Sequence, residues 1–154
     1  MTTAYAQDVI VAASPVSTGS SVSADAPSKK ALWGGRVLSG IPLAFLAFDT
    51  VIHLTAVAPA MKGSEDLGWS PSVLVPLGVV QLICWVLYAI PRTAVLGAIL
   101  WTGYLGGAVA THVRVDNPLF SHVLFPVYVA AMLWGGLWLR NQRLQGALHW
   151  RAQG

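Results

Sequence analysis

Four long apolar stretches, almost free of ionisable groups, constrain the fold of this chain more than any other feature. They cover residues 37–58, 72–90, 93–111 and 119–139. A transmembrane helix needs about 20 mostly apolar residues, so each stretch is long enough to cross a bilayer. Backbone exposed to lipid must satisfy its own hydrogen bonds, which favours helices. We therefore predict an all-α fold, a four-helix transmembrane bundle with up-down-up-down topology.

Composition supports the bilayer as the surroundings of this chain. Only 10% of its 154 residues are charged and 55% are hydrophobic, whereas about one quarter of the residues of a soluble domain are charged. The alternative is a very apolar soluble α-helical domain. The second and third stretches disfavour it, because neither contains a single charged residue.

The first thirty residues differ from the rest in composition. The segment "SPVSTGSSVSADAPSKK" is rich in Ser, Ala and Pro and has no helical apolar period. Such a segment buries too little apolar surface to offset its chain entropy. We predict a disordered cytoplasmic tail over residues 1–30, a four-span transmembrane domain over residues 31–143, and a short basic cytoplasmic tail over residues 144–154.

The basic residues predict the orientation. With four spans, seven of the nine fall on the side of the termini, and only Lys62 and Arg114 fall on the other. Basic residues stay in the cytoplasm, so both termini should be cytoplasmic. The same asymmetry accounts for the high isoelectric point without a nucleic-acid partner. The seven are Lys29, Lys30, Arg36, Arg92, Arg140, Arg143 and Arg151.

A few polar residues inside the spans indicate a ligand pocket. Asp49 and His53 are four residues apart, so they share a helix face. A carboxylate inside a bilayer needs a partner, and Gln81 and Tyr104 lie at a similar depth in the second and third spans. The loop after the third span would cap this layer from outside. The predicted pocket residues are Asp49, His53, Gln81, Tyr104, His112, Arg114, Asp116 and His122.

Two plainer interpretations remain open for these residues. Each polar side chain within a span can be a satisfied interhelical hydrogen bond, and the loop can be a solvated turn. Metal binding by His112, Asp116 and His122 has little support, because their spacing matches no zinc pattern. We predict no metal site.

Glycines predict where helices approach one another. Gly103 and Gly107 form a G-x-x-x-G pattern, and small residues let transmembrane helices come close. The predicted packing positions are Gly97, Gly103, Gly106, Gly107, Gly135 and Gly136.

Three segments resemble the DoxX-like family of small bacterial membrane proteins. They read "GRVLSGIPLAFLAFD", "LYAIPRTAVLGAILWTGYLGGAVATHVRV" and "PLFSHVLFPVYVAAMLWGGLWLR", within residues 35–141. The resemblance implies a four-helix protein of the bacterial inner membrane, in a family whose members mostly lack an assigned activity. Its name comes from a subunit of an archaeal quinone-linked oxidase. Close relatives often carry an acid at the position of Gln81 and a lysine at that of His53, so this chain has less charge there.

Three functions are compatible with these features. The leading one is an accessory inner-membrane protein that binds a lipid-like or quinone ligand in an outer-facing polar pocket. The others are a subunit of a quinone-linked membrane oxidoreductase that works with a redox-enzyme partner, and a structural assembly partner or homo-oligomer. The sequence has no phosphate-binding glycine loop, no G-x-S-x-G and no C-x-x-C. No cofactor motif is evident, a quinone rests on the resemblance, and no catalytic residue is assigned.

Overall fold

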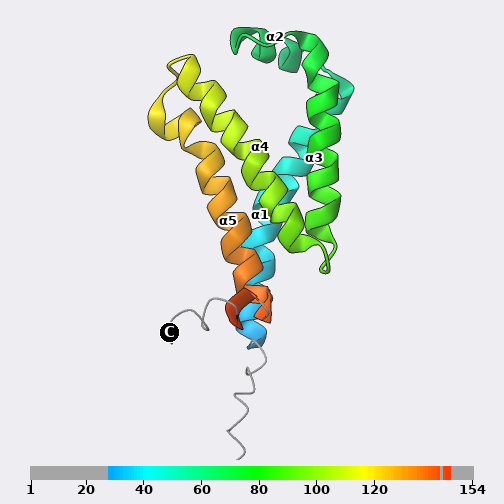
Figure 1. The fold of residues 1–154 in the computed structure, drawn as a ribbon, viewed down its shortest axis with the longest axis vertical. Helices are drawn as coiled ribbons and strands as arrows, with labels where there is room; N and C mark the ends of the chain where they lie inside the picture. Colours follow the sequence, from blue (N-terminus) through cyan, green and yellow to red (C-terminus); the bar gives the residue numbers. More distant parts are fainter. Residues whose placement is uncertain (1–27, 143, 147–154) are drawn as a thin grey trace, which may run out of the picture.

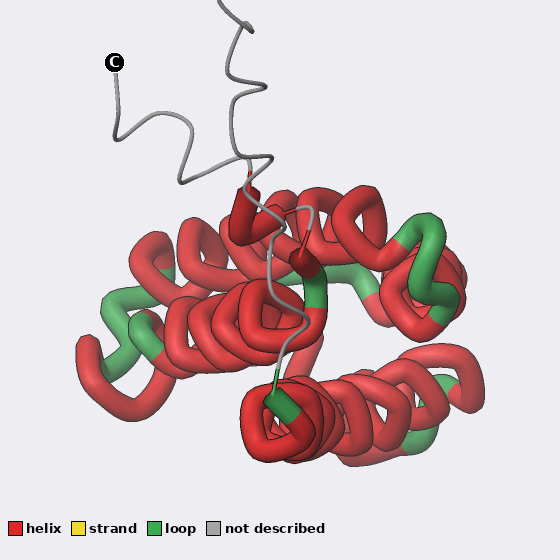
Figure 2. Tube along the Cα trace, turned by 90° about the horizontal axis from the view of Figure 1, so that it is seen from below, coloured by secondary structure: helices red, strands yellow, loops and turns green. Residues whose placement is uncertain are grey.

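Four helices long and apolar enough to cross a membrane make up most of the fold. The structure is a computed structural model that describes residues 28–142 and 144–146. Within that part every regular element is helical (Figure 2). The elements are α1 (Lys29–Thr55), α2 (Ala58–Asp66), η1 (Pro71–Val73), α3 (Leu74–Ala89), α4 (Ala94–Arg114), η2 (Leu119–Val123) and α5 (Phe125–Arg140).

The long helices form an up-down-up-down bundle, which confirms the predicted fold. The start of α1, the α3–α4 turn and the end of α5 lie towards one end, and α2 and the α4–α5 connection lie at the other (Figure 1). Each long helix packs on two neighbours: α1 on α3 and α5, and α4 on α3 and α5. The bundle is therefore a closed ring of four helices.

The outer surface of this ring is apolar. Ile41, Phe48, Ile83 and Ile99 are each at least half exposed, although they lie in the middle of long helices. A soluble protein rarely exposes so continuous an apolar surface. In a bilayer these side chains contact lipid tails, so the fold is that of a multi-pass membrane protein.

Helix α1 begins well before the apolar stretch that predicts it. The Ser28 side chain accepts a hydrogen bond from the Ala31 backbone N–H at 3.2 Å and caps the helix. Lys29 and Lys30 are thus helical, although the predicted tail extends to residue 30. The rest of that tail, residues 1–27, and most of the predicted C-terminal tail lie outside the described residues.

The connection between the first two spans is not a simple loop. Residues 58–66 form helix α2, which lies across the end of the bundle (Figure 1). Val57 is extended and Pro59 occupies the first turn, where its missing N–H is not needed. None of the residues of α2 is fully buried.

The polar stretch after the third span is also more helical than predicted. Helix α4 continues through His112 to Arg114, and the π-helical segment η2 already begins at Leu119. The expected loop therefore shrinks to residues 115–118. Asp116 has a φ of 54° in the tight turn that remains, a conformation that Asp tolerates better than most residues.

The core lies between the helices near their middle and towards the end where the α3–α4 turn lies. Tyr88 and Trp101 are wholly buried. The Tyr88 hydroxyl lies 3.0 Å from the Ser39 hydroxyl on α1 and 2.7 Å from the Leu133 carbonyl on α5, within hydrogen-bond distance of both. Tyr88 thereby ties three helices together.

Candidate ligand pocket

Three polar side chains from three helices meet inside the bundle. The Gln81 amide on α3 donates to the Asp49 carboxylate on α1 at 2.5 Å and contacts the Tyr104 hydroxyl on α4 at 2.8 Å. Gln81 is wholly buried, so its amide is held between the two other groups. The predicted polar layer thus exists as a hydrogen-bonded group, Asp49–Gln81–Tyr104.

His53 extends this group by one helical turn. Its Nδ1 lies 2.9 Å from the Asp49 backbone carbonyl and 3.6 Å from the Asp49 carboxylate. A carbonyl oxygen only accepts, so Nδ1 carries the proton of this hydrogen bond. In the neutral ring Nε2 is then an acceptor, free to receive a hydrogen bond from another group.

A cavity of about 680 Å³ opens beside these side chains. We call it the Asp49 cavity. Its polar lining includes Asp49, His53, Tyr104 and His112, while Gln81 lies behind it and does not line it. The size is that of a site for a small organic ligand. The apolar part of the lining consists of Phe45, Leu46, Leu67, Trp69, Val73, Pro76, Leu77, Gly103, Leu105, Gly107, Ala108, Phe125, Pro126 and Val129, and Ser64 and Thr111 complete it.

Helical periodicity explains why these residues share the cavity. On α1 the lining residues Phe45, Asp49 and His53 recur every four positions, which is one face of a helix. On α4 the lining residues Gly107 and Thr111 follow Gly103 at the same interval. The two faces look at each other because α1 and α4 lie across the ring from one another.

The cap differs from the prediction, because only His112 of its predicted residues lines the cavity. The Arg114 guanidinium donates to the Leu67 carbonyl at 2.6 Å and lies 5.5 Å from the centre of the Trp69 ring. Arg114 therefore fastens the end of α4 to the segment between α2 and α3. Arg114 does not line the Asp49 cavity, where the prediction placed it.

The other polar residues of this end also have local roles. Nδ1 of His112 is 2.8 Å from the Asn117 amide, and its ring lies edge-on to that of His122 at 5.7 Å. His122 is exposed and contacts Ser121. Asp116 is exposed in its turn. Neither Asp116 nor His122 lines the cavity, so both are corrections to the predicted pocket.

Metal binding finds no support in the described part of the chain. No three His, Cys, Asp or Glu side chains gather there closely enough to hold a metal ion. His112 and His122 approach each other without a third ligand.

Three of the four glycines of α4 differ from the prediction. A Cβ atom added at Gly103, Gly106 or Gly107 would meet nothing within 4 Å among the described residues. The G-x-x-x-G pattern therefore brings no helix close, and Gly103 and Gly107 instead leave room for the Asp49 cavity.

The other three predicted glycines, Gly97, Gly135 and Gly136, do lie at contacts between helices. Gly97 lies against the Tyr88 backbone, and Gly136 lies against Ser39 and Gly35 on α1. Gly135 is near the Leu38 side chain. Gly78 lies against the backbone of His53 and Leu54, a contact the sequence did not reveal.

Comparison with known protein families gives a match to the DoxX-like family. The family profile matches residues 37–136, well over half of the chain. The chain belongs to the DoxX-like family. All three residues of the Asp49–Gln81–Tyr104 group fall within the matched region. Comparison with curated proteins and with solved structures gives no significant match.

Two features of the DoxX-like protein's cavity were missed by sequence reasoning. Helix α2 and the segment after it contribute Ser64, Leu67 and Trp69 to the lining. Phe45 and Phe125 pack edge to face at 5.3 Å beside it. The only available signal for α2 was Pro59 near the start of a segment rich in helix-forming residues.

Proposed function

We propose that this DoxX-like protein is an accessory protein of the bacterial inner membrane that binds a lipid-like ligand in the Asp49 cavity. A quinone is the ligand class we favour. The proposal places both termini in the cytoplasm, because seven of the nine basic residues lie on their side of the spans. The Asp49 cavity then opens towards the outer half of the membrane.

The observation that carries the proposal is the hydrogen bonding of Gln81. Its amide N–H groups reach both the Asp49 carboxylate and the Tyr104 oxygen. Since the Tyr104 oxygen accepts this bond, its own O–H remains a donor, and Tyr104 lines the cavity. We expect this hydroxyl to act as a hydrogen-bond donor to a ligand in the cavity.

A hydrogen-bond acceptor lies in the same cavity as this donor. When the ring is neutral, Nε2 of His53 is an acceptor, and His53 lines the same cavity. A quinone ring carries carbonyl oxygens that accept, and its reduced form carries hydroxyl groups that donate. The Tyr104 hydroxyl would donate to a quinone carbonyl, and His53 or Asp49 would accept from a hydroxyl of the reduced form. Phe45, Trp69 and Phe125 would contact the apolar ring and tail.

The test compares two tyrosines. The full-length protein in mild detergent is titrated with a short-tailed benzoquinone, and binding is followed by calorimetry. Tyr104→Phe removes the donor and should weaken binding by up to about tenfold, the effect of one hydrogen bond. Tyr128→Phe is the control, because Tyr128 is half exposed on the outside of α5 and does not line the cavity.

Two results would count against the proposal. One is equal affinity for Tyr104→Phe and Tyr128→Phe, which would place the ligand elsewhere. The other is a wild-type protein that shows no saturable binding, which would remove the quinone as the ligand class.

A further inference from the structure

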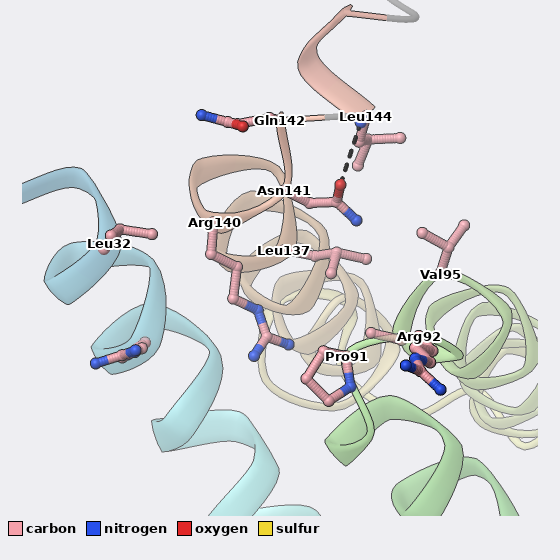
Figure 3. Close-up of a pocket in the computed structure, with 11 residues that line it drawn as sticks. Leu32, Pro91, Arg92, Val95, Leu137, Arg140, Asn141, Gln142 and Leu144 are labelled. Carbon is pink, nitrogen blue, oxygen red and sulfur yellow. Dashed lines mark hydrogen bonds between the residues drawn. The ribbon is translucent and has the colours of Figure 1, made fainter. Parts of the chain in front are cut away.

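A second cavity, of about 880 Å³, lies at the opposite end of the bundle. The start of α1, the α3–α4 turn and the end of α5 surround it (Figure 3). Three arginines line it, Arg36, Arg92 and Arg140, together with apolar residues such as Leu32 and Leu137. We call it the Arg140 cavity. It shares no lining residue with the Asp49 cavity.

Arg140 is held in place but its charge is incompletely satisfied. Its guanidinium carbon lies 5.1 Å from the centre of the Tyr88 ring, whose hydroxyl is fixed by α1 and α5. In Figure 3 the side chain points from α5 into the space between α1 and Pro91. Its Nε and Nη2 atoms are buried and have no hydrogen-bond partner among the residues that the structure describes.

Burying the N–H groups of a cation without hydrogen-bond acceptors is unfavourable. A hydrogen bond to a charged group is stronger than one between neutral groups, and a buried donor without a partner loses its hydration as well. Guanidinium presents its N–H groups as a planar fork that fits the oxygens of phosphate or carboxylate. Arg140 also lines the cavity, so an anion bound there would lie beside this guanidinium.

No carboxylate in the described part of the chain lies near these arginines. Four of the six Asp and Glu residues are described, and they lie in the second half of α1, in α2 or in the α4–α5 turn. The other two, Asp8 and Asp25, precede Ser28 and fall outside the described residues. The arginine end thus has an excess of positive charge.

We propose that the Arg140 cavity binds a phosphate group, and that the group belongs to the headgroup of an anionic phospholipid. Arg140 receives the phosphate oxygens, and Arg36 and Arg92, both exposed, add charge at the rim. The apolar lining, including Leu32, Val95 and Leu137, suits the glycerol and the start of the acyl chains. Basic pockets on the positively charged side of transmembrane bundles are suited to such headgroups.

The experiment measures anion binding by the full-length protein in a mild neutral detergent. Thermal stability is followed while phosphatidylglycerol, phosphatidylcholine or inorganic phosphate is added. Arg140→Gln and Arg92→Gln should each weaken the apparent affinity for phosphatidylglycerol by about tenfold. Arg92 lies exposed in a turn, so its variant remains informative if Arg140→Gln folds poorly. Lys62→Gln removes the same charge from α2, at the other end, and should have no effect.

The three additives distinguish the sources of the phosphate. A response to phosphatidylglycerol that phosphate and phosphatidylcholine do not reproduce supports the lipid headgroup. A response to inorganic phosphate of the same size supports the site and assigns it to a soluble phosphate.

Two outcomes would overturn the site. If Lys62→Gln weakens the response as much as Arg140→Gln, the attraction is non-specific. If the wild type responds to neither phosphatidylglycerol nor inorganic phosphate, the Arg140 cavity does not bind a phosphate group.

Discussion

Replacing Gly136 by alanine tests the packing of α1 against α5. A Cβ atom at Gly136 would lie 2.7 Å from the Ser39 backbone nitrogen and 2.8 Å from the Gly35 carbonyl oxygen, and the Ser39 hydroxyl would be closer still. Ordinary contacts between heavy atoms are about 3.5–4.0 Å. Because two of the three obstacles are backbone atoms, α1 itself must move away by about 1 Å.

The size of the effect follows from two opposing terms. Overfilling a packed interface destabilises by about 1–3 kcal/mol. Alanine also favours the helix over glycine by about 1 kcal/mol. Gly106→Ala is the matched control, because its Cβ would meet nothing within 4 Å among the described residues. We expect Gly136→Ala to be less stable than Gly106→Ala by about 1–3 kcal/mol.

The assay is reversible unfolding of both variants in mixed micelles, with helix content followed by circular dichroism during titration with a denaturing detergent. The movement of Ser39 should also weaken its hydrogen bond to Tyr88. Equal stability of the two variants would refute the reasoning, since it would mean that α1 and α5 are not in close contact at this point.

Three further predictions concern the cavity, the tail and the orientation. Gly107→Leu should leave the melting temperature within a few degrees of wild type but fill the Asp49 cavity, so it should lose quinone binding in calorimetry. Deleting residues 1–27 while keeping Ser28 as the cap of α1 should also leave the melting temperature nearly unchanged; a large drop would show that those residues contact the bundle. Cysteines at Glu65 and Asp116 should react with impermeant thiol reagents in intact cells; reaction only after permeabilisation would reverse the proposed orientation.

The polar layer could be predicted from the sequence because a carboxylate inside the bundle can be stabilised by only a few of the side chains in the spans. A carboxylate within a membrane span requires a polar partner, and counting residues from the helix ends placed Gln81 and Tyr104 at the depth of Asp49. Both contacts are present in the structure. His53 followed from the four-residue spacing alone.

Only some of the glycine contacts could be predicted: Gly97, Gly135 and Gly136 lie at helix contacts, whereas Gly103, Gly106 and Gly107 do not. In a membrane protein both the core face and the lipid face of a helix are apolar, so hydrophobic periodicity does not tell them apart. Gly103 and Gly107 share a face, but that face looks into the Asp49 cavity. Gly78, without any motif, forms a close contact with α1.

The prediction that Arg114 and Asp116 cap the pocket was wrong for a related reason. The position of Arg114 depends on α2 and the segment that follows it, which bring the Leu67 carbonyl within 2.6 Å. A short helix with no fully buried residue leaves little trace in the hydrophobic pattern. The partner of the long Arg114 side chain therefore depends on the path of the segment between α1 and α3, which the hydrophobic pattern does not reveal.

The most direct test of the central claim is to identify what co-purifies with the protein. Wild type, Gly107→Leu and the control Gly106→Leu are purified in the same mild detergent, and the bound lipids and quinones are quantified by mass spectrometry. We predict about one quinone-like amphiphile per chain in the Asp49 cavity of wild type and of Gly106→Leu, and its loss from Gly107→Leu, whereas phospholipid bound at the Arg140 cavity should remain in all three. The same extract from all three proteins would contradict a ligand in the Asp49 cavity.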